Sequence, residues 1–225
     1  VQTDIWVRAM RLAGHDCLYV CADDTHGTPI MLQAAAEGIT PEALIERVGA
    51  ERRSDFAAFN IGFDNYYTTH SEENRRLTVE MYRALAAAGH ITRRSVRQAY
   101  DEKAGMFLPD RYIVGTCPHC GYANARGDQC ENCTRVLDPT DLLEPRSAIS
   151  GSTDLEVRET KHLYLLQSKL ADEVAVWIEA HADVWPALTL SIARKWITEG
   201  LHDRGITRDL DWGVPVDRPG FEEKV

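Results

Sequence analysis

Four cysteines form the most specific chemical pattern in the sequence. Cys117 and Cys120 lie in CPHC, and after nine intervening residues Cys130 and Cys133 lie in CENC. A Cys-x-x-Cys turn directs both thiolates to one side, and two such turns supply the four soft ligands that tetrahedral zinc prefers. We therefore expect one Zn²⁺ per chain on these cysteines. Because four thiolates leave no position for water or substrate, its role is expected to be structural.

Interpretations of the cysteines other than zinc binding have less support. Two disulfides or an idle thiol cluster remain open in principle, but the chain has no secretory signal that would favour disulfides. His119, inside the first CxxC turn, is a possible substitute ligand, although four cysteines already suffice. Cys17 and Cys21 lie in a short apolar run and are interpreted as small hydrophobic residues of a core strand.

A second candidate site is the acidic turn at Asp23 and Asp24. Both follow a predicted strand, and in open α/β sheets ligands bind beyond the carboxyl ends of the strands. A carboxylate there can hold a substrate ammonium group or a ribose hydroxyl, but it can equally solvate or cap a turn. His26, a lone loop histidine, is interpreted as a local hydrogen-bond partner rather than a catalyst.

The N-terminal part must position this turn. Residues 1–12 predict a helix ending at Gly14, and residues 17–21 predict a strand buried in a parallel sheet. Two helices follow, with the cap and proline pairs Thr28-Pro29 and Thr40-Pro41, and Gly38 ends the first. Residues 63–69 predict a strand, and the capping-box spacing from Thr69 to Glu72 starts a helix that runs to Gly89.

After Gly89 the pattern changes to short strands that must position the cysteines. Strand-like pieces cover 92–100, 111–117, 146–150 and 156–166; helices are predicted for 168–184 and 186–201, and 206–216 is extended. We predict an α/β fold interrupted by a mixed α+β zinc-binding insertion. The expected domains are 1–89, the insertion 90–200 with its four-cysteine knuckle, and a return segment 201–225.

Composition limits the function classes. The chain has 225 residues, 44% of them hydrophobic, and a net charge of -10, which argues against a protein that binds polyanions over its whole surface. Residues 91–135 carry seven Lys or Arg and five acids, so this region alone could face a polyanion. No membrane span or secretory signal is evident, and we expect a cytoplasmic protein without a membrane partner.

Three longer motifs carry a family resemblance. The stretches CADDTHGTPIM from Cys21, THSEEN from Thr69, and GMFLPDR from Gly105, which leads into GTCP, closely resemble bacterial methionyl-tRNA synthetases of class I. The likeness implies a Rossmann-like nucleotide-binding fold and the activation of methionine by ATP as methionyl adenylate, with transfer to tRNA(Met). ATP with its Mg²⁺, methionine and tRNA(Met) are the implied partners. Asp24 matches the acid that holds the methionine amino group, and the four cysteines match the zinc ligands.

Arg208, in ITRD, also matches an arginine of the family on the ATP side, with a surface arginine as the alternative. In other respects the likeness is incomplete. The family's HIGH and KMSKS sequences are absent, so we expect this chain to be an internal piece of the catalytic region, inactive on its own. The alternative function is a non-catalytic zinc-ribbon module that binds nucleic acid or protein, with Arg93, Arg94 and Arg97 beside the cysteines.

Overall fold

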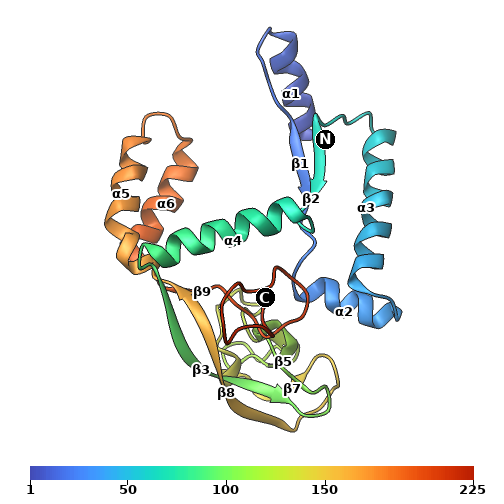
Figure 1. Ribbon diagram of the computed structural model, residues 1–225, viewed down its shortest axis with the longest axis vertical. Coiled ribbons are helices and arrows are strands. Elements are labelled where there is room, and N and C mark those ends of the chain that lie inside the picture. The colour runs from blue at the N-terminus through green and yellow to red at the C-terminus, as the bar shows by residue number, and fades with distance from the viewer. The chain divides into compact units, whose positions relative to one another are not determined.

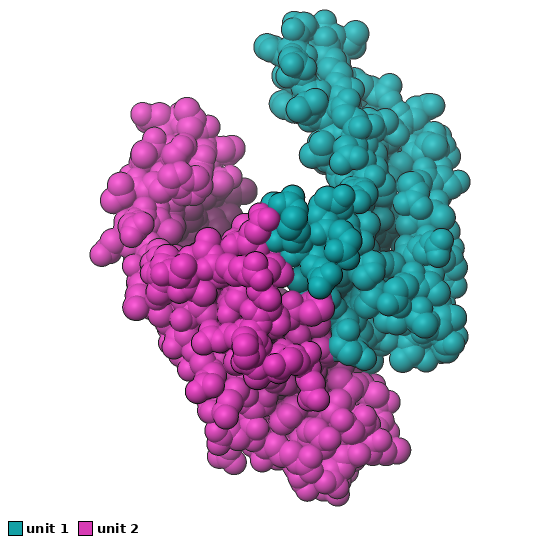
Figure 2. Space-filling view, viewed as in Figure 1, with its two compact units in different colours: residues 1–77, 211–214 teal, residues 78–210, 215–225 magenta.

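The computed structural model describes residues 1–225 as a mixed α/β structure with six α-helices and nine strands (Figure 1). The chain divides into two compact units. Unit 1 comprises Val1–Leu77 and Asp211–Val214, and unit 2 comprises Thr78–Leu210 and Pro215–Val225 (Figure 2). No helix is both long and apolar enough to cross a lipid bilayer.

Unit 1 is organised around two short parallel strands. Strands β1 and β2 pair in register from Val20 opposite Asn65 to Asp23 opposite Thr68. The elements are α1 (Gln2–Leu12), β1 (Val20–Asp23), α2 (Thr28–Glu37), α3 (Pro41–Ala58), β2 (Asn65–Thr68) and the start of α4 (Glu72–Ala87). This order confirms the expected alternation, and the parallel pairing places the carboxyl ends of β1 and β2 side by side.

Local sequence signals set the ends of α2 and α3. The Thr40 hydroxyl accepts a hydrogen bond from the Ala43 N–H at 3.2 Å, and Pro41 is the first helical residue, as expected. Gly38 ends α2 in the left-handed conformation, at φ +68°. The expected cap at Thr28 is wrong by one position, because Gly27 precedes the helix and Thr28 is already inside it.

The predicted start of α4 also needs a correction. Ser71, not Thr69, caps the helix, because its hydroxyl accepts from the Asn74 N–H at 3.2 Å. The Thr69 hydroxyl instead accepts from the Thr25 N–H at 2.9 Å. A residue forty-four positions away therefore uses the hydroxyl that a local capping box would have needed.

The expectation that residues 17–21 form a buried strand is wrong. The strand begins later, at Val20, and Leu18 and Val20 are 80% and 64% exposed. Cys17 and Cys21 are half-buried rather than in a closed core. The physical reason is that a two-stranded sheet leaves side chains on its outer face without apolar neighbours.

Unit 2 contains two antiparallel sheets. Strand β3 pairs with β8 along its whole length, from Ile91 opposite Leu165 to Asp101 opposite Leu155. The four-stranded sheet has the order β4-β3-β8-β9 and the three-stranded sheet the order β6-β5-β7. Their bounds are β3 (Ile91–Asp101), β4 (Met106–Phe107), β5 (Ile113–Thr116), β6 (Ala125–Arg126), β7 (Leu143–Ser147), β8 (Leu155–Leu165) and β9 (Arg204–Gly205).

Helices α5 (Ala171–Ala180) and α6 (Ala187–Glu199) form the expected helical pair of unit 2, and short 3-10 turns lie at Asp110–Tyr112, Pro139–Asp141 and Gln167–Leu170. The core of the unit includes Leu108, Tyr112, Ile113, Leu163 and Ile178, each at most 5% exposed. The predicted α+β character after Gly89 follows from these antiparallel strands and the two helices.

The boundary between the units lies inside α4, between Leu77 and Thr78. The predicted domains 1–89, 90–200 and 201–225 divide the chain by expected function rather than by compactness. This division stays a prediction. The α/β character is established, but two parallel strands do not by themselves define a Rossmann sheet.

Candidate functional site

The two cysteine turns of unit 2 repeat one backbone pattern. In the first, the Cys117 N–H donates to the Tyr122 carbonyl at 2.9 Å and the Gly121 N–H donates to the Cys117 carbonyl at 3.0 Å. In the second, the Cys130 N–H donates to the Arg135 carbonyl at 2.9 Å and the Thr134 N–H donates to the Cys130 carbonyl at 2.8 Å. The fourth residue after each leading cysteine has a positive φ, +73° at Gly121 and +60° at Thr134. Matching backbone turns therefore present both cysteine pairs.

The four sulfur atoms converge in one place. All four Sγ atoms lie within 4.8 Å of one another, with 3.9 Å between Cys117 and Cys133 and 3.6 Å between Cys120 and Cys130. These separations exceed the roughly 2.05 Å of a disulfide. They match the edge of about 3.8 Å of a tetrahedron with zinc–sulfur bonds of about 2.3 Å. The cluster therefore fits a tetrahedral metal.

The surroundings of the sulfurs explain how the cluster is supported. Cys117 and Cys130 are buried, whereas Cys120 is exposed. The Asn132 side chain donates to the Cys120 sulfur at 3.6 Å and is the main reason why the pKa of this thiol falls to about 6. His119 lies outside the cluster, with its Nδ1 at 3.2 Å from an Arg135 guanidinium nitrogen. The alternative with His119 as a ligand is therefore not needed.

In unit 1, the two aspartates of the acidic turn have different environments. Asp23 is 7% exposed, and its carboxylate accepts from Arg52 at 2.5 Å and from the Tyr66 hydroxyl at 2.6 Å. Burial, followed by this bond to Asp23, raises the pKa of Tyr66 to about 12. Asp24 is exposed at the edge where the carboxyl ends of β1 and β2 meet. Asp23 is therefore a structural ion-pair partner, and only Asp24 is free to contact a ligand.

Sequence reasoning missed an aromatic cluster beside Asp24. His26 Nε2 lies 3.3 Å from His70 Nδ1, and the Trp212 ring stacks on His70 with centroids 4.6 Å apart. Burial lowers the pKa of His26, and His70 lowers it further, against an opposing effect of Asp24. No local signal connects Trp212 with residues near position 26, because it lies 186 positions after His26. The contact to His70 agrees with a hydrogen-bond role for His26, but the partner lies forty-four positions away and is not the local one that was predicted.

Arg208, in unit 2, is held by its backbone. Its N–H donates to the Val225 carbonyl at 2.6 Å, and the Val225 N–H donates back to Arg208 at 3.1 Å. One guanidinium nitrogen donates to the carbonyls of Gly205 and Thr207 at 3.1 and 2.8 Å. The side chain is otherwise exposed, so the remaining guanidinium nitrogens are available to an anion.

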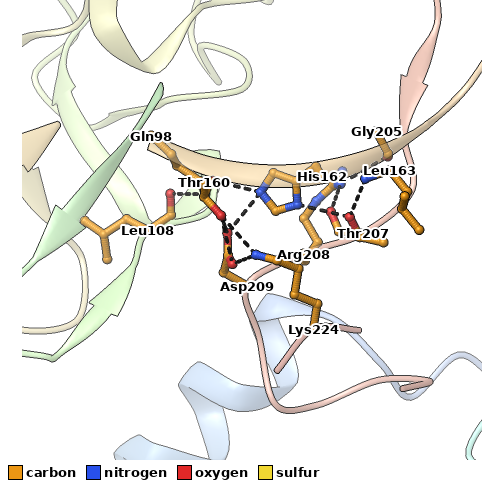
Figure 3. Close-up of polar contacts among 10 residues, drawn as sticks. All are labelled: Gln98, Leu108, Thr160, His162, Leu163, Gly205, Thr207, Arg208, Asp209 and Lys224. Atoms are coloured by element: carbon orange, nitrogen blue, oxygen red, sulfur yellow. Dashed lines mark hydrogen bonds and ion pairs between the residues drawn. The ribbon is translucent and has the colours of Figure 1, made fainter. Parts of the chain in front are cut away.

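A buried polar network fixes the segment that carries Arg208 (Figure 3). His162 Nε2 lies 3.0 Å from the Asp209 carboxylate, and its Nδ1 lies 3.0 Å from the Thr207 hydroxyl. Because Thr207 Oγ1 accepts from the Leu163 N–H at 3.0 Å, its own proton is free to point to Nδ1. Lys224 donates to the same Asp209 carboxylate. Residues 207 and 209, on either side of Arg208, are therefore both tied to β8.

This network predicts an acid-sensitive contribution to stability. Burial opposes ionisation of Asp209, but hydrogen bonds from His162 and Lys224 hold its pKa below the ordinary value. Asp209→Asn should therefore destabilise β8 by about 3 kcal/mol at neutral pH, because Lys224 loses its buried counter-charge. The wild-type advantage should shrink below about pH 4, as protons bind the unfolded carboxylate first.

Hydrogen exchange of the β8 amides, at neutral pH and below about pH 4, measures the stability lost in Asp209→Asn. Asp154→Asn, at an exposed position, is the matched control. An advantage that stayed constant with pH would contradict the ionic role of Asp209.

Three of the basic residues near the cysteines are paired with acids. Arg94 is paired with Asp203, Arg111 with Asp128 at 2.6 Å, and Arg126 with Glu131 at 3.8 Å. Arg93 and Arg97 are exposed on β3.

Unit 2 also has a cavity of about 660 Å³ whose lining includes Asp110, His162 and Arg208. Burial, against an opposing effect of Arg208, raises the pKa of Asp110 there.

Comparison with known proteins gives a consistent result over the whole chain. A family model described as "tRNA synthetases class I (M)" matches residues 1–225. A methionine–tRNA ligase of Streptomyces avermitilis is 57% identical over 220 residues, which is 98% of this chain and 38% of the relative. One of Cereibacter sphaeroides is 53% identical over 229 residues, 99% of this chain and 40% of the relative. The chain thus spans about two fifths of these relatives.

A solved structure shares the fold. Mycobacterium tuberculosis methionyl-tRNA synthetase in complex with methionyl-adenylate aligns with a TM-score of 0.67 and 22% identity, covering 99% of this chain and 39% of that chain. At this identity the match concerns the fold and not the details of the site.

Proposed function

Because the chain belongs to the class I tRNA synthetases for methionine, we propose that its full-length protein is a methionine–tRNA ligase. In the proposed reaction the methionine carboxylate attacks the α-phosphorus of ATP, which forms methionyl adenylate and releases pyrophosphate. A terminal ribose hydroxyl of tRNA(Met) then attacks the methionyl carbonyl, and AMP leaves. The observation that carries this proposal is the family match over residues 1–225.

Asp24 is the proposed contact to the methionine amino group. Its exposed carboxylate stands at the carboxyl edge of a parallel strand pair, where α/β folds bind their ligands. An ammonium group offers charge-assisted hydrogen bonds to such a carboxylate, and these depend strongly on geometry. The stable pairing of Asp23 with Arg52 supports the choice of Asp24 over its neighbour.

Arg208 is the proposed residue on the ATP side. A guanidinium group can stabilise the negative charge that develops on transferring phosphate oxygens. The backbone pairing with Val225 supports a fixed base for this side chain, and the two carbonyl contacts hold one of its guanidinium nitrogens. The Mg²⁺ that accompanies ATP belongs to the substrate in this proposal.

Cys117, Cys120, Cys130 and Cys133 are the proposed ligands of a structural zinc ion. The sulfur separations support a four-thiolate tetrahedron, which leaves no coordination position for substrate. The ion would join the two cysteine turns to each other. Only the short strands β5 and β6 lie beside these turns in the chain. We further propose that 1–89 and 201–225 belong to a Rossmann-like catalytic domain and that 90–200 is its connective insertion.

Methionine-dependent exchange of pyrophosphate into ATP tests the proposal. The full-length protein should catalyse exchange with methionine and not with leucine. The 225-residue polypeptide should be inactive at the same concentration, because it contains neither a HIGH nor a KMSKS sequence to contact the phosphates. Absence of exchange in the full-length protein would overturn the ligase proposal, whereas comparable exchange by both would overturn only the inactivity of the shorter chain.

A zinc-ribbon module that binds nucleic acid or protein without chemistry is the weaker alternative. It accounts for the cysteines, but of the three arginines named for it, Arg94 is already paired with Asp203, which leaves Arg93 and Arg97 exposed. It also gives no role to the parallel strands and helices of unit 1.

A further inference from the structure

We propose that Trp212 and Thr69 are positioning residues that hold Thr25 and thereby aim the Asp24 carboxylate at the amino group of the substrate. This inference rests on the proposed function and on the proposed role of Asp24. It concerns unit 1 alone, because the segment Asp211–Val214 is part of that unit.

Every polar group of Thr25 is bound. Its N–H donates to the Thr69 hydroxyl at 2.9 Å, and its own hydroxyl lies 3.1 Å from Thr69 Oγ1 and 3.3 Å from Thr68 Oγ1. Its carbonyl accepts from the indole N–H of Trp212 at 2.8 Å. Thr25 is only 5% exposed, so water cannot easily replace these partners. The residue that follows Asp24 is therefore immobilised from two directions.

Trp212 is itself a rigid anchor. Its side chain is 6% exposed, stacked on His70 at 4.6 Å and packed edge-on against His26 at 5.5 Å. The two histidines also contact each other. An indole packed on two sides is restricted in its rotation, so packing positions its N–H and, through it, the Thr25 carbonyl.

The residue before Asp24 is immobilised as well, because Arg52 and Tyr66 both bind the Asp23 carboxylate. Asp24 is thus an exposed carboxylate between two locked neighbours. Its backbone is fixed before a ligand arrives, and only its two side-chain torsions remain to be ordered. Pre-organisation of this kind strengthens binding by reducing the entropy lost on association.

The neighbours of Asp24 do not serve only the stability of the fold. A buried threonine needs its polar groups satisfied, but a nearby main-chain group would do so without a tryptophan from the far end of the chain. The indole contact reaches the peptide unit directly after Asp24, where a shift of the backbone rotates the carboxylate. The expected consequence of losing it is a specific defect in recognition of the amino group.

Trp212→Phe and Thr69→Val in the full-length protein test the inference. Phenylalanine keeps an aromatic ring against His70 but removes the N–H, and valine keeps the volume of threonine but removes the acceptor. Each variant should raise the KM for methionine about tenfold in pyrophosphate exchange, as expected for weakening one charge-assisted contact. The KM for ATP should stay within about twofold of wild type.

A methionine analogue without the α-amino group distinguishes positioning from general damage. The inhibition constant of this analogue should be unchanged in both variants. Without an amino group it does not bind Asp24, so a misplaced Asp24 carboxylate cannot weaken its binding. Trp196→Phe is the matched control, since Trp196 is 60% exposed on α6 and should affect neither value.

An unchanged KM for methionine in both variants would overturn the inference, as would an equal loss of affinity for methionine and for the analogue. If the wild-type full-length protein showed no methionine-dependent exchange, the proposed function would fail and the inference with it. The wild-type assay and the variant assays therefore separate the two failures.

Discussion

Replacing Cys117 with serine in the full-length protein should abolish stoichiometric zinc binding and unfold the region around the cysteine turns. Cys117 is 1% exposed, and its sulfur lies 3.9 Å from that of Cys133. A serine hydroxyl is a poor zinc ligand at neutral pH, and binding free energies for structural zinc reach about 10 kcal/mol or more. The expected loss of local stability is therefore several kcal/mol, and a strong chelator should reproduce it.

Metal analysis by mass spectrometry and hydrogen exchange by peptide measure these two effects. Protection should be lost in 113–147, which holds β5 to β7, while 1–77 should stay comparatively protected, since unit 1 contains none of the four cysteines. Cys17→Ser is the matched control, because Cys17 lies in unit 1 outside the cluster. Full protection of 113–147 in a metal-free protein would show that zinc does not stabilise this region.

Asp24→Asn should have the largest effect on activity without unfolding the protein. The amide keeps the size of the carboxylate but removes the negative charge that would face the methionine ammonium group. We expect kcat/KM for methionine to fall about 100-fold, equivalent to roughly 2.7 kcal/mol, with a small change in melting temperature. The exposed position of Asp24 is the reason for the small effect on stability.

Two variants make this experiment specific. Asp23→Asn should instead lower stability, because Arg52 and the Tyr66 hydroxyl lose a buried carboxylate. Asp16→Asn, at an exposed position before β1, should change neither activity nor stability. If Asp24→Asn kept wild-type kcat/KM for methionine, the proposed assignment of this residue would be wrong.

Local patterns in the sequence predicted the features that depend on neighbouring residues. The cysteine spacing predicted a four-sulfur cluster, because each CxxC turn is closed by hydrogen bonds within six residues. Thr40 and Pro41 predicted the start of α3 for the same reason, since a helix cap joins residues three positions apart. The alternation of elements and the two helices after β8 were likewise predicted correctly.

The errors have a common physical cause. Thr69 was assigned to a local cap, but a distant backbone N–H at Thr25 takes its hydroxyl. The apolar residues from Cys17 to Cys21 predicted a buried strand, but burial depends on what covers both faces of a sheet and not on the composition of the strand. Both interpretations relied on local residues where a long-range contact decided the outcome.

The sequence by itself determined the family, the zinc-type cysteine spacing and the acidic turn, because these are carried by contiguous motifs. Only the tertiary structure decided which aspartate of the turn is free, that Trp212 binds the carbonyl of Thr25, and that His162 and Lys224 converge on Asp209. The physical reason is that a hydrogen bond or ion pair between distant segments needs a particular arrangement of the backbone, and no spacing along the chain encodes that arrangement.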